Sequence, residues 1–366
     1  MEIERQPNVT VSLPGEAIPT VPNRQSPIPN PQSPIPNPTF TRNRILLLLF
    51  FAAASIALLL WLGGGSRETL SLLAQADWGL LGLAVLIHYS GFAVRGHRWQ
   101  MLLAGMGHRL PYARVTGLLI SGWFVSALLP ARAGDAARIA ALRLERAPVP
   151  VADSLSSIVL ERLLDILAIL GLGGSFAFFV LAERLPLWVL SGYAAAAGLL
   201  IVFGAGLLIS PSLLGWLRRF SAHRFWQRGL DFAGQAVVAL RSLLARPGQA
   251  LFLLGESLYI WLCDALLLWL VALALGVALP FPAAAFAALT VDIFASVPLT
   301  PGGIGQIEVA YAGLLSLLSL PIAVVPAAVL LTRVISYWSF LVFSGVVAAV
   351  TGSDVLFLRR GERLIG

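Results

Sequence analysis

The sequence predicts an all-α polytopic membrane protein, with about six full transmembrane helices and two broken, re-entrant helical hairpins, or about eight membrane segments in all. Composition is the first indication: 58% of the residues are hydrophobic and 12% are charged, about half the charged fraction of a soluble protein. The mean hydropathy is +0.85, and successive apolar runs approach the roughly 20 residues that cross a bilayer core. The last indication is that two of these runs are interrupted by one pattern, Pro-x-x-x-Gly.

The N-terminal segment, residues 1–40, is rich in proline and contains a tandem repeat, Gln25–Pro31 followed by Gln32–Pro38. A segment of this composition cannot bury a core, so we expect a disordered cytoplasmic tail. A simple tether is the favoured interpretation, and recruitment of a partner protein is the alternative.

The membrane domain is expected to cover residues 41–352. Its first two spans are predicted near 45–62 and 79–94. A basic stretch over 95–114 follows, which we assign to a cytoplasmic loop because loops on that side are enriched in arginine.

The first broken hairpin follows this loop. Val115–Leu129 is apolar but short, and Pro130 stops it. The segment after Gly134 has a helical pattern but carries Arg138 and other charges, so it cannot lie in lipid as a full span. We therefore expect a hairpin that enters and leaves on one side, surrounded by protein or water.

The rest of the chain is assigned by the same criteria of length, charge and breaks. The second broken pair has its hinge at four residues, Pro301, Gly302, Gly303 and Gly305. In order, we expect spans near 154–182 and 187–209, an interfacial amphipathic helix within 212–248, a span near 250–275, the second broken pair over 281–320, a last span near 322–350 and a basic cytoplasmic tail over 353–366.

Charge sets the orientation. The chain holds no lysine, so arginine supplies all the positive charge behind its net charge of +7. Because these arginines lie in short loops rather than in one domain, nucleic acid is a poor partner. With the N-terminus inside, the outer loops hold only Arg67 and Arg184, as the positive-inside rule requires. Three crossings then separate the two broken pairs, which makes them an inverted repeat. We expect a bacterial plasma (inner) membrane location, with both termini cytoplasmic.

Charged residues inside the apolar segments are the candidate site. Glu161, Arg162 and Asp165 lie in one span, and the two carboxylates share a helix face. The sequence offset that carries Pro130 onto Pro301 also carries Arg162 onto Arg333. Ionisable residues at membrane depth are functional candidates, although a structural ion-pair cluster is the alternative.

Arginine suits a phosphate ligand, because its planar fork of donors can engage two oxygens. We expect Arg162 and Arg333 to bind a phosphate from opposite halves, with Arg132 and Arg138 at the cytoplasmic mouth. Glu161 and Asp165 would orient these arginines or meet a cationic headgroup.

Asp135 and Glu308 each begin a helix after a hinge. Exposed N–H groups at such helix ends attract anions, so both residues belong to the candidate substrate site. Capping of those N–H groups alone is the alternative role. If Arg333 does not bind an anionic ligand, we expect it to pair with Asp292, Glu308 or Asp264.

Four further ionisable residues lie at depth: His88, Glu256, Asp264 and Asp292. They could form a proton relay or a cation site, but their spacing shows no ligand pattern, and structural polar contacts are the favoured interpretation. Cys263 is the only cysteine and the histidines have no metal spacing. We therefore expect no metal and no cofactor.

At these residues the sequence resembles a known family, the lysylphosphatidylglycerol synthase transmembrane region, whose members are described as flippase-like. The match runs from about Leu46 to Val350 and is carried by five ordered motifs: Arg95–Trp99, Gly122–Arg138, Glu161–Asp165, Pro301–Glu308 and Arg333. In multidomain members, a separate soluble domain attaches the amino acid to the lipid. About 16 residues follow Val350 here, so we expect no aminoacyl-transferase domain.

The resemblance implies a lipid translocase, of flippase or scramblase type, rather than an enzyme. Its partners would be phospholipids or lipid-linked headgroups, and a homodimer or a partner lipid-modifying enzyme is also compatible. A membrane-embedded enzyme or accessory subunit of lipid or glycolipid synthesis is the alternative, with Glu161 and Asp165 as its candidate carboxylate pair.

Overall fold

The computed structural model describes residues 66–129, 133–145, 147–179, 185–209, 219, 224–296 and 300–362. Within these ranges every regular element is helical. The proline-rich tail, the first span near 45–62, Pro130 and Arg132 lie outside the described residues.

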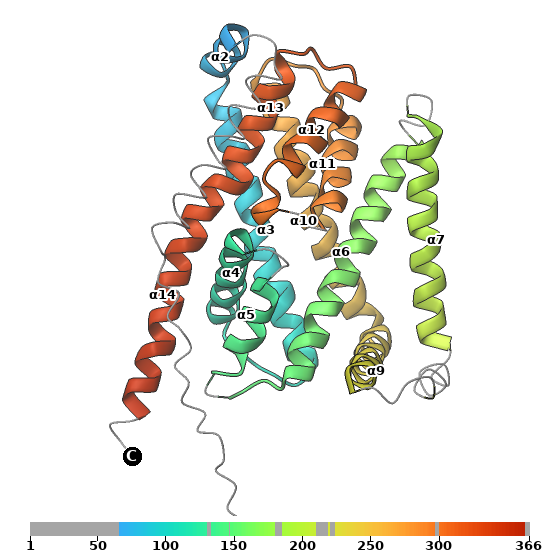
Figure 1. The fold of residues 1–366 in the computed structure, drawn as a ribbon, viewed down its shortest axis with the longest axis vertical. Coiled ribbons are helices and arrows are strands. Elements are labelled where there is room, and N and C mark those ends of the chain that lie inside the picture. The colour runs from blue at the N-terminus through green and yellow to red at the C-terminus, as the bar shows by residue number, and fades with distance from the viewer. Residues whose placement is uncertain are drawn as a thin grey trace, which may run out of the picture. The chain divides into compact units, whose positions relative to one another are not determined.

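The helices follow one another along the chain with short connections (Figure 1). A 3-10 turn, η1, lies at the second hinge, and a π-helical segment, η2, joins the last two helices. The elements are α2 (Ser66–Ala74), α3 (Trp78–Gly105), α4 (Tyr112–Leu128), α5 (Ala133–Leu142), α6 (Val151–Phe179), α7 (Leu187–Ile209), α9 (Arg224–Leu244), α10 (Pro247–Ala274), α11 (Phe281–Ala295), η1 (Pro301–Gly303), α12 (Gln306–Leu317), α13 (Val324–Arg333), η2 (Val334–Trp338) and α14 (Ser339–Glu362).

Three described helices are long and apolar enough to cross a membrane: α3, α10 and the continuous stretch Val324–Gly352. By contrast, α4 and α11 are apolar but have only 17 and 15 residues. Helices of that length are about 22–26 Å long, shorter than the roughly 30 Å hydrocarbon core. The prediction of a helical protein with membrane-length apolar segments is thus confirmed.

The short apolar helices each belong to a hairpin, α4 with α5 and α11 with α12. Figure 1 shows the first hairpin in the half of the bundle near α9 and the second in the half near α2, with their turns facing each other. α4 contacts η1 at this meeting point, and the Tyr337 hydroxyl donates to the Ala127 carbonyl at 3.3 Å. The end of α4 in the first hairpin and the η1 turn of the second hairpin therefore lie together.

The second helix is longer than the sequence predicts. Asp77 caps α3 by accepting from the N–H groups of Gly79 and Leu80 at 2.8 and 3.1 Å, and α3 continues to Gly105. The predicted span 79–94 is therefore too short, and the assignment of residues 95–114 to a loop is wrong for its first eleven positions.

The arginines explain this error. Arg95 and Arg98 are 6% and 1% exposed, because α3 packs along α10 and also contacts α6, whose carboxylates pair with these arginines. A buried charge is tolerated when such partners surround it. Those partners lie far away in the sequence, so the local pattern indicated a loop.

The first hairpin is closed by two glycines. Gly122 of α4 faces Gly134 of α5, and a Cβ atom at Gly134 would overlap with the Gly122 carbonyl oxygen. The Ser126 hydroxyl accepts from the Gly134 N–H at 3.1 Å. Close approach of the two backbones therefore requires glycine at position 134.

Gly134→Ala is expected to destabilise the protein by about 1–3 kcal/mol, because an added methyl forces two packed backbones apart. Gly255→Ala is the matched control, since Gly255 is a helical glycine with open space around its Cα and alanine favours helix. Thermal denaturation midpoints of the two purified variants check this. Equal midpoints would contradict the close-packing argument.

The second hinge uses backbone conformations that favour glycine. Gly302, Gly303 and Gly305 have φ angles of 61°, 65° and 84°, in the left-handed region that side chains disfavour. The Glu308 carboxylate then accepts from the Gly305 N–H at 2.7 Å. The chain thus breaks at residues 301–305 and resumes as α12.

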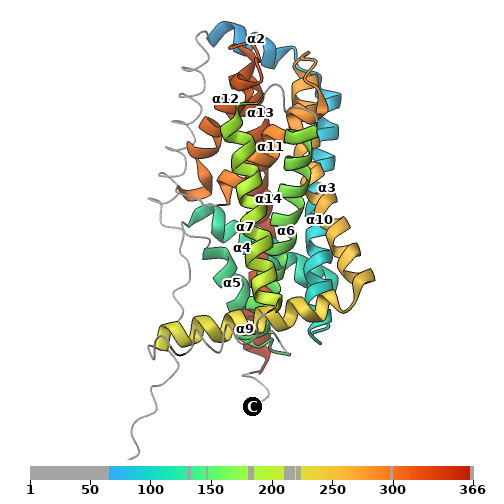
Figure 2. The same cartoon turned by 90° about the vertical axis from the view of Figure 1, so that its right-hand side faces the viewer.

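The remaining helices flank this arrangement. α6 and α7 run side by side in Figures 1 and 2, and α9 lies across their ends. α9 falls within the stretch predicted to be interfacial, 212–248, and buries Leu230, Val237 and Leu243 on one side. Its position at a membrane surface stays a prediction.

Candidate functional site

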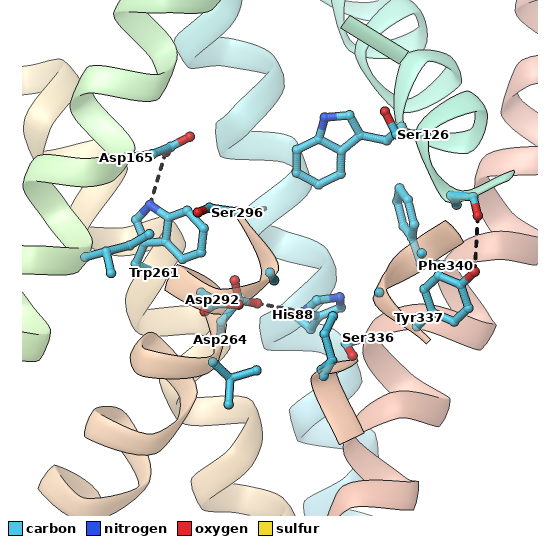
Figure 3. A pocket seen from close by; sticks show the side chains of 18 of the residues that line it. His88, Ser126, Asp165, Trp261, Asp264, Asp292, Ser296, Ser336, Tyr337 and Phe340 are labelled. Atoms are coloured by element: carbon cyan, nitrogen blue, oxygen red, sulfur yellow. Dashed lines mark hydrogen bonds and ion pairs between the residues drawn. The ribbon is translucent and has the colours of Figure 1, made fainter. Parts of the chain in front are cut away.

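A cavity of about 490 Å³ lies between the two hairpins, and Ala127 of α4, Asp135 of α5 and Gly302 of η1 line it. Its walls come from α3, α6, α10 and the α13–η2–α14 stretch, together with residues of both hairpins (Figure 3). The helix residues that line it, such as Phe92 of α3 and Leu267 of α10, lie away from the ends of their helices. The cavity therefore lies along the length of these helices rather than at their ends.

Arg162 of α6 is the accessible arginine of this cavity. Its side chain is 26% exposed, and its guanidinium is 3.5 Å from Asp135, 3.5 Å from Asp165 and 3.6 Å from Glu161. Its Nε atom is buried without a hydrogen-bond partner. These contacts are long for charge-assisted hydrogen bonds, which are typically 2.7–2.9 Å, so Arg162 retains donor capacity toward the cavity.

Arg333 lines the same cavity but is held firmly. Its Nε donates to Glu308 at 2.7 Å and its Nη2 donates to the Gly302 carbonyl at 3.2 Å. The guanidinium also lies over the Tyr337 ring, 4.4 Å from the centroid. Glu308 is thus shared between Arg333 and the Gly305 N–H, and this pair ties α12, the hinge and α13 together.

Arg138 lies behind the cavity wall rather than on it. Its side chain is 0% exposed, it donates to both oxygens of Glu161, and its guanidinium lies 3.9 Å from the Trp99 ring centroid. Glu161 is equally buried, at 2%. This pair therefore anchors α5 of the first hairpin onto α6.

Of the predicted substrate residues, four line the cavity: Asp135, Arg162, Asp165 and Arg333. Asp165 is fixed by Arg98 at 2.7 Å and by the indole N–H of Trp261 at 3.1 Å. Glu308 supports Arg333 from behind. The structure thus brings both predicted phosphate-binding arginines to one cavity, although they lie on different halves of the chain.

A second charged group lines the cavity, and it includes Arg95, which the sequence pattern assigns to a loop. Arg95 donates to Asp264 at 3.3 Å, and His88 is hydrogen-bonded to the same carboxylate through Nδ1 at 3.1 Å. Arg95 also lies between the rings of Trp123 and Trp261, 5.0 and 5.2 Å from their centroids.

Charge in an apolar run could have suggested Asp264 and Asp292, but only packing shows that they share the cavity. The remaining ionisable residue of that group, Glu256, does not line it: its Oε1 is 2.5 Å from His97, nearer one end of α3 and α10.

Comparison with known proteins agrees with this architecture. The family model of the lysylphosphatidylglycerol synthase TM region matches residues 45–344. A protein named glycosyltransferase AglD, from Haloferax volcanii, is 28% identical over 308 residues, which cover 74% of this chain and 48% of the relative. The chain thus spans about half the length of that protein.

Membrane proteins of similar size also match. A UPF0104 membrane protein from Methanothermobacter thermautotrophicus is 27% identical over 306 residues, covering 77% of this chain and 86% of the relative. Another, from Pyrococcus horikoshii, is 22% identical over 319 residues. Because the family match covers most of the sequence, this chain is an integral membrane protein that belongs to the family of the lysylphosphatidylglycerol synthase transmembrane region.

Proposed function

We propose that this protein is a lipid translocase, which passes the phosphate-bearing headgroup of a lipid through the cavity between its two hairpins. The observation that carries the proposal is a polar cavity at mid-helix depth with an accessible, incompletely paired arginine, Arg162. Arginine binds phosphate oxygens through several donors at once. A polar chamber at the bilayer midplane lowers the cost of moving such a group through hydrocarbon.

The acyl chains need an apolar path beside the cavity. Ile166 of α6 lines the cavity and is 41% exposed. Leu167 of α6 and Phe294 of α11, which lie on two helices in contact, are 48% and 51% exposed. A headgroup held at Arg162 could therefore leave its tails in the surrounding lipid.

The order of elements supports alternating access to this cavity. The three long helices α6, α7 and α10 separate the hairpin α4–α5 from the hairpin α11–α12. With three crossings between them, the two hairpins open toward opposite faces and form an inverted repeat, as in many transporters with central binding sites. In this proposal α9 and both termini lie on the cytoplasmic side of the plasma membrane, and the arginine distribution supports that orientation.

An enzymatic role is the alternative, and the name of the glycosyltransferase relative keeps an accessory function in glycolipid synthesis open. The carboxylates Glu161 and Asp165 would have to perform the chemistry. Both are paired with arginines at 2.6–2.7 Å, however, which leaves neither free as a general acid or base. Lipid extracts made with and without the protein distinguish the two roles, because only an enzyme yields a new lipid species.

The test of translocation is the exchange of fluorescent phospholipids between leaflets of proteoliposomes, measured by bleaching of the outer leaflet. Arg162→Ala is expected to slow exchange by about 10- to 100-fold, since a hydrogen bond to a charged group contributes about 1.5–3 kcal/mol. Arg109→Ala is the matched control, because Arg109 is exposed and does not line the cavity.

Three results would be informative. If more than half of the fluorescence, the share of the outer leaflet, is bleached with wild type and Arg109→Ala but not with Arg162→Ala, the result supports translocation through the cavity. Equal rates for both variants would exclude Arg162 as the headgroup ligand. Bleaching that stops at half for wild type with several headgroups would overturn the proposed function.

A further inference from the structure

His88 presents an unsatisfied acceptor to the cavity. Its side chain is 5% exposed, and its Nδ1 lies 3.1 Å from a carboxylate oxygen of Asp264. Because an ionised carboxylate only accepts, Nδ1 must carry the proton and donate. In the neutral imidazole the other ring nitrogen, Nε2, is a lone-pair acceptor, and it is buried without a hydrogen-bond partner.

Asp292 presents a second unsatisfied acceptor. It lies on α11, lines the cavity beside Asp264 and His88 (Figure 3), and its Oδ2 atom is buried without a partner. Buried polar atoms are nearly always hydrogen-bonded, so an exception calls for an explanation. Asp292 as a whole is half-buried, but an ionised carboxylate oxygen that is shielded from water without a donor is costly, which favours uptake of a proton.

The charges around the cavity include one more carboxylate than arginine. Five arginines in the described part of the chain belong to the network: Arg95, Arg98, Arg138, Arg162 and Arg333. Six carboxylates face them: Asp135, Glu161, Asp165, Asp264, Asp292 and Glu308. Every one of these carboxylates except Asp292 contacts an arginine. Among the described residues, Asp292 is therefore the one carboxylate of the network without an ion pair.

The neighbours of Asp292 do not supply the missing positive charge. The carboxylates of Asp264 and Asp165 and the guanidinium of Arg95 are the charges that act on it, and Arg95 is already paired. The titratable groups near Asp292 come from five helices. His88 and Arg95 of α3, Arg162 and Asp165 of α6, Asp264 of α10 and Tyr311 of α12 line the same cavity, and Tyr193 of α7 is within electrostatic reach of Asp292.

We propose that Asp292, together with the His88–Asp264 pair, forms a proton-binding site in the cavity wall, and that an anionic headgroup enters the cavity together with a proton. The inference rests on the proposed lipid translocation and adds its coupling ion. A proton forms an O–H bond with the Asp292 carboxylate and cancels the surplus negative charge. On release, it passes to water at the opposite face, and no electrons are exchanged.

The charge state of Asp292 then controls access of the phosphate. With Asp292 protonated, five arginines balance five carboxylates, and a phosphate meets no net repulsion. With Asp292 ionised, a bare carboxylate shares the cavity with the phosphate, and like charges at close range disfavour binding. Translocation of an anionic phospholipid should therefore be fast at acid pH and slow at alkaline pH.

The experiment measures exchange of fluorescent phosphatidylglycerol in proteoliposomes as a function of pH. Wild type is expected to slow on its alkaline limb by up to about tenfold per pH unit, as one titrating group requires. Asp292→Asn mimics the protonated carboxyl and should keep the acid rate at every pH. Glu256→Gln is the matched control: Glu256 also has a buried unpartnered oxygen beside a histidine, but lies outside the cavity. It should retain the wild-type profile.

A second measurement does not depend on transport. Infrared spectra of the purified protein in lipid nanodiscs, recorded during a pH titration, show the carbonyl stretch of each protonated carboxyl as a band. One such band should be absent from Asp292→Asn and present in Glu256→Gln. Absence of that difference would overturn the proton site, even if translocation itself is established. If wild type moves no lipid but the band is lost in Asp292→Asn, the proposed function fails and the proton site stands.

The opposite pH dependence would also overturn the proposal. If Asp292 instead binds the ammonium group of a cationic or zwitterionic lipid, it must be ionised to do so. Asp292→Asn would then reduce translocation of phosphatidylethanolamine at every pH, and acid would slow the wild type. A pH-independent wild type would likewise exclude coupling through this site.

Discussion

Replacing Arg333 with alanine is expected to destabilise the protein by about 3–5 kcal/mol, because it leaves a buried carboxylate without its partner. Glu308 is 2% exposed and receives the Arg333 Nε at 2.7 Å. The same substitution removes the donor to the Gly302 carbonyl and the stacking contact on Tyr337. The second hinge would lose the contact that fixes it to α13, and the thermal denaturation midpoint of the purified protein should fall sharply.

A double replacement distinguishes the effect of leaving Glu308 unpaired from the effect of losing the Arg333 side chain. Arg333→Met combined with Glu308→Leu removes both charges and keeps most of the buried volume. Such exchanges are often neutral or stabilising, so the double variant should recover most of the midpoint. It should still translocate lipid slowly, because the cavity has lost one arginine. A stable Arg333→Ala single variant would show that Glu308 finds another donor.

Arg138→Ala is expected to have a comparable effect, again about 3–5 kcal/mol, although Arg138 does not reach the cavity. Its guanidinium donates to both oxygens of Glu161 and lies against the Trp99 ring. Alanine would expose a buried carboxylate to an empty space and release α5 from α6. Because Arg162 lies 3.6 Å from Glu161, we also expect Arg162 to turn away from the cavity toward the vacated carboxylate.

Two controls define this prediction. Arg143→Ala changes an exposed arginine just after the same helix and should stay within about 0.5 kcal/mol of wild type, as surface substitutions usually do. Arg138→Lys keeps the charge but loses the two-pronged geometry, so it should recover the midpoint only in part. Equal midpoints for Arg138→Ala and Arg143→Ala would refute the anchoring role.

The helices and their breaks were largely predictable, because they depend on local sequence. The short apolar run before Pro130 ends as α4 at Leu128, where the proline indicated. The run before Pro301 ends earlier than its proline and glycines indicated, because α11 stops at Ala295. The family was predictable as well, since its motifs lie in order along the chain and the match to residues 45–344 confirms it.

The end of α3 was not predictable for a physical reason. Arginine in a sequence window indicates a water-exposed loop, and Arg95 has no acidic residue near it in sequence. Its partner, Asp264, lies 169 residues away on α10. Only the packing of α3 against α10 supplies the countercharge that allows this arginine to be buried.

The sequence by itself determined that the chain is helical, that it is a membrane protein, that its apolar runs are interrupted twice by a Pro-x-x-x-Gly pattern, and that it belongs to this family. These properties follow from composition, from the spacing of apolar residues and from proline and glycine, all of which act over a few turns. The tertiary structure decided which charges share the cavity, which of them are already paired, and that Asp292 is not. Ion pairs and orphaned acceptors depend on distances between segments far apart in the chain, and those distances exist only once the helices have packed.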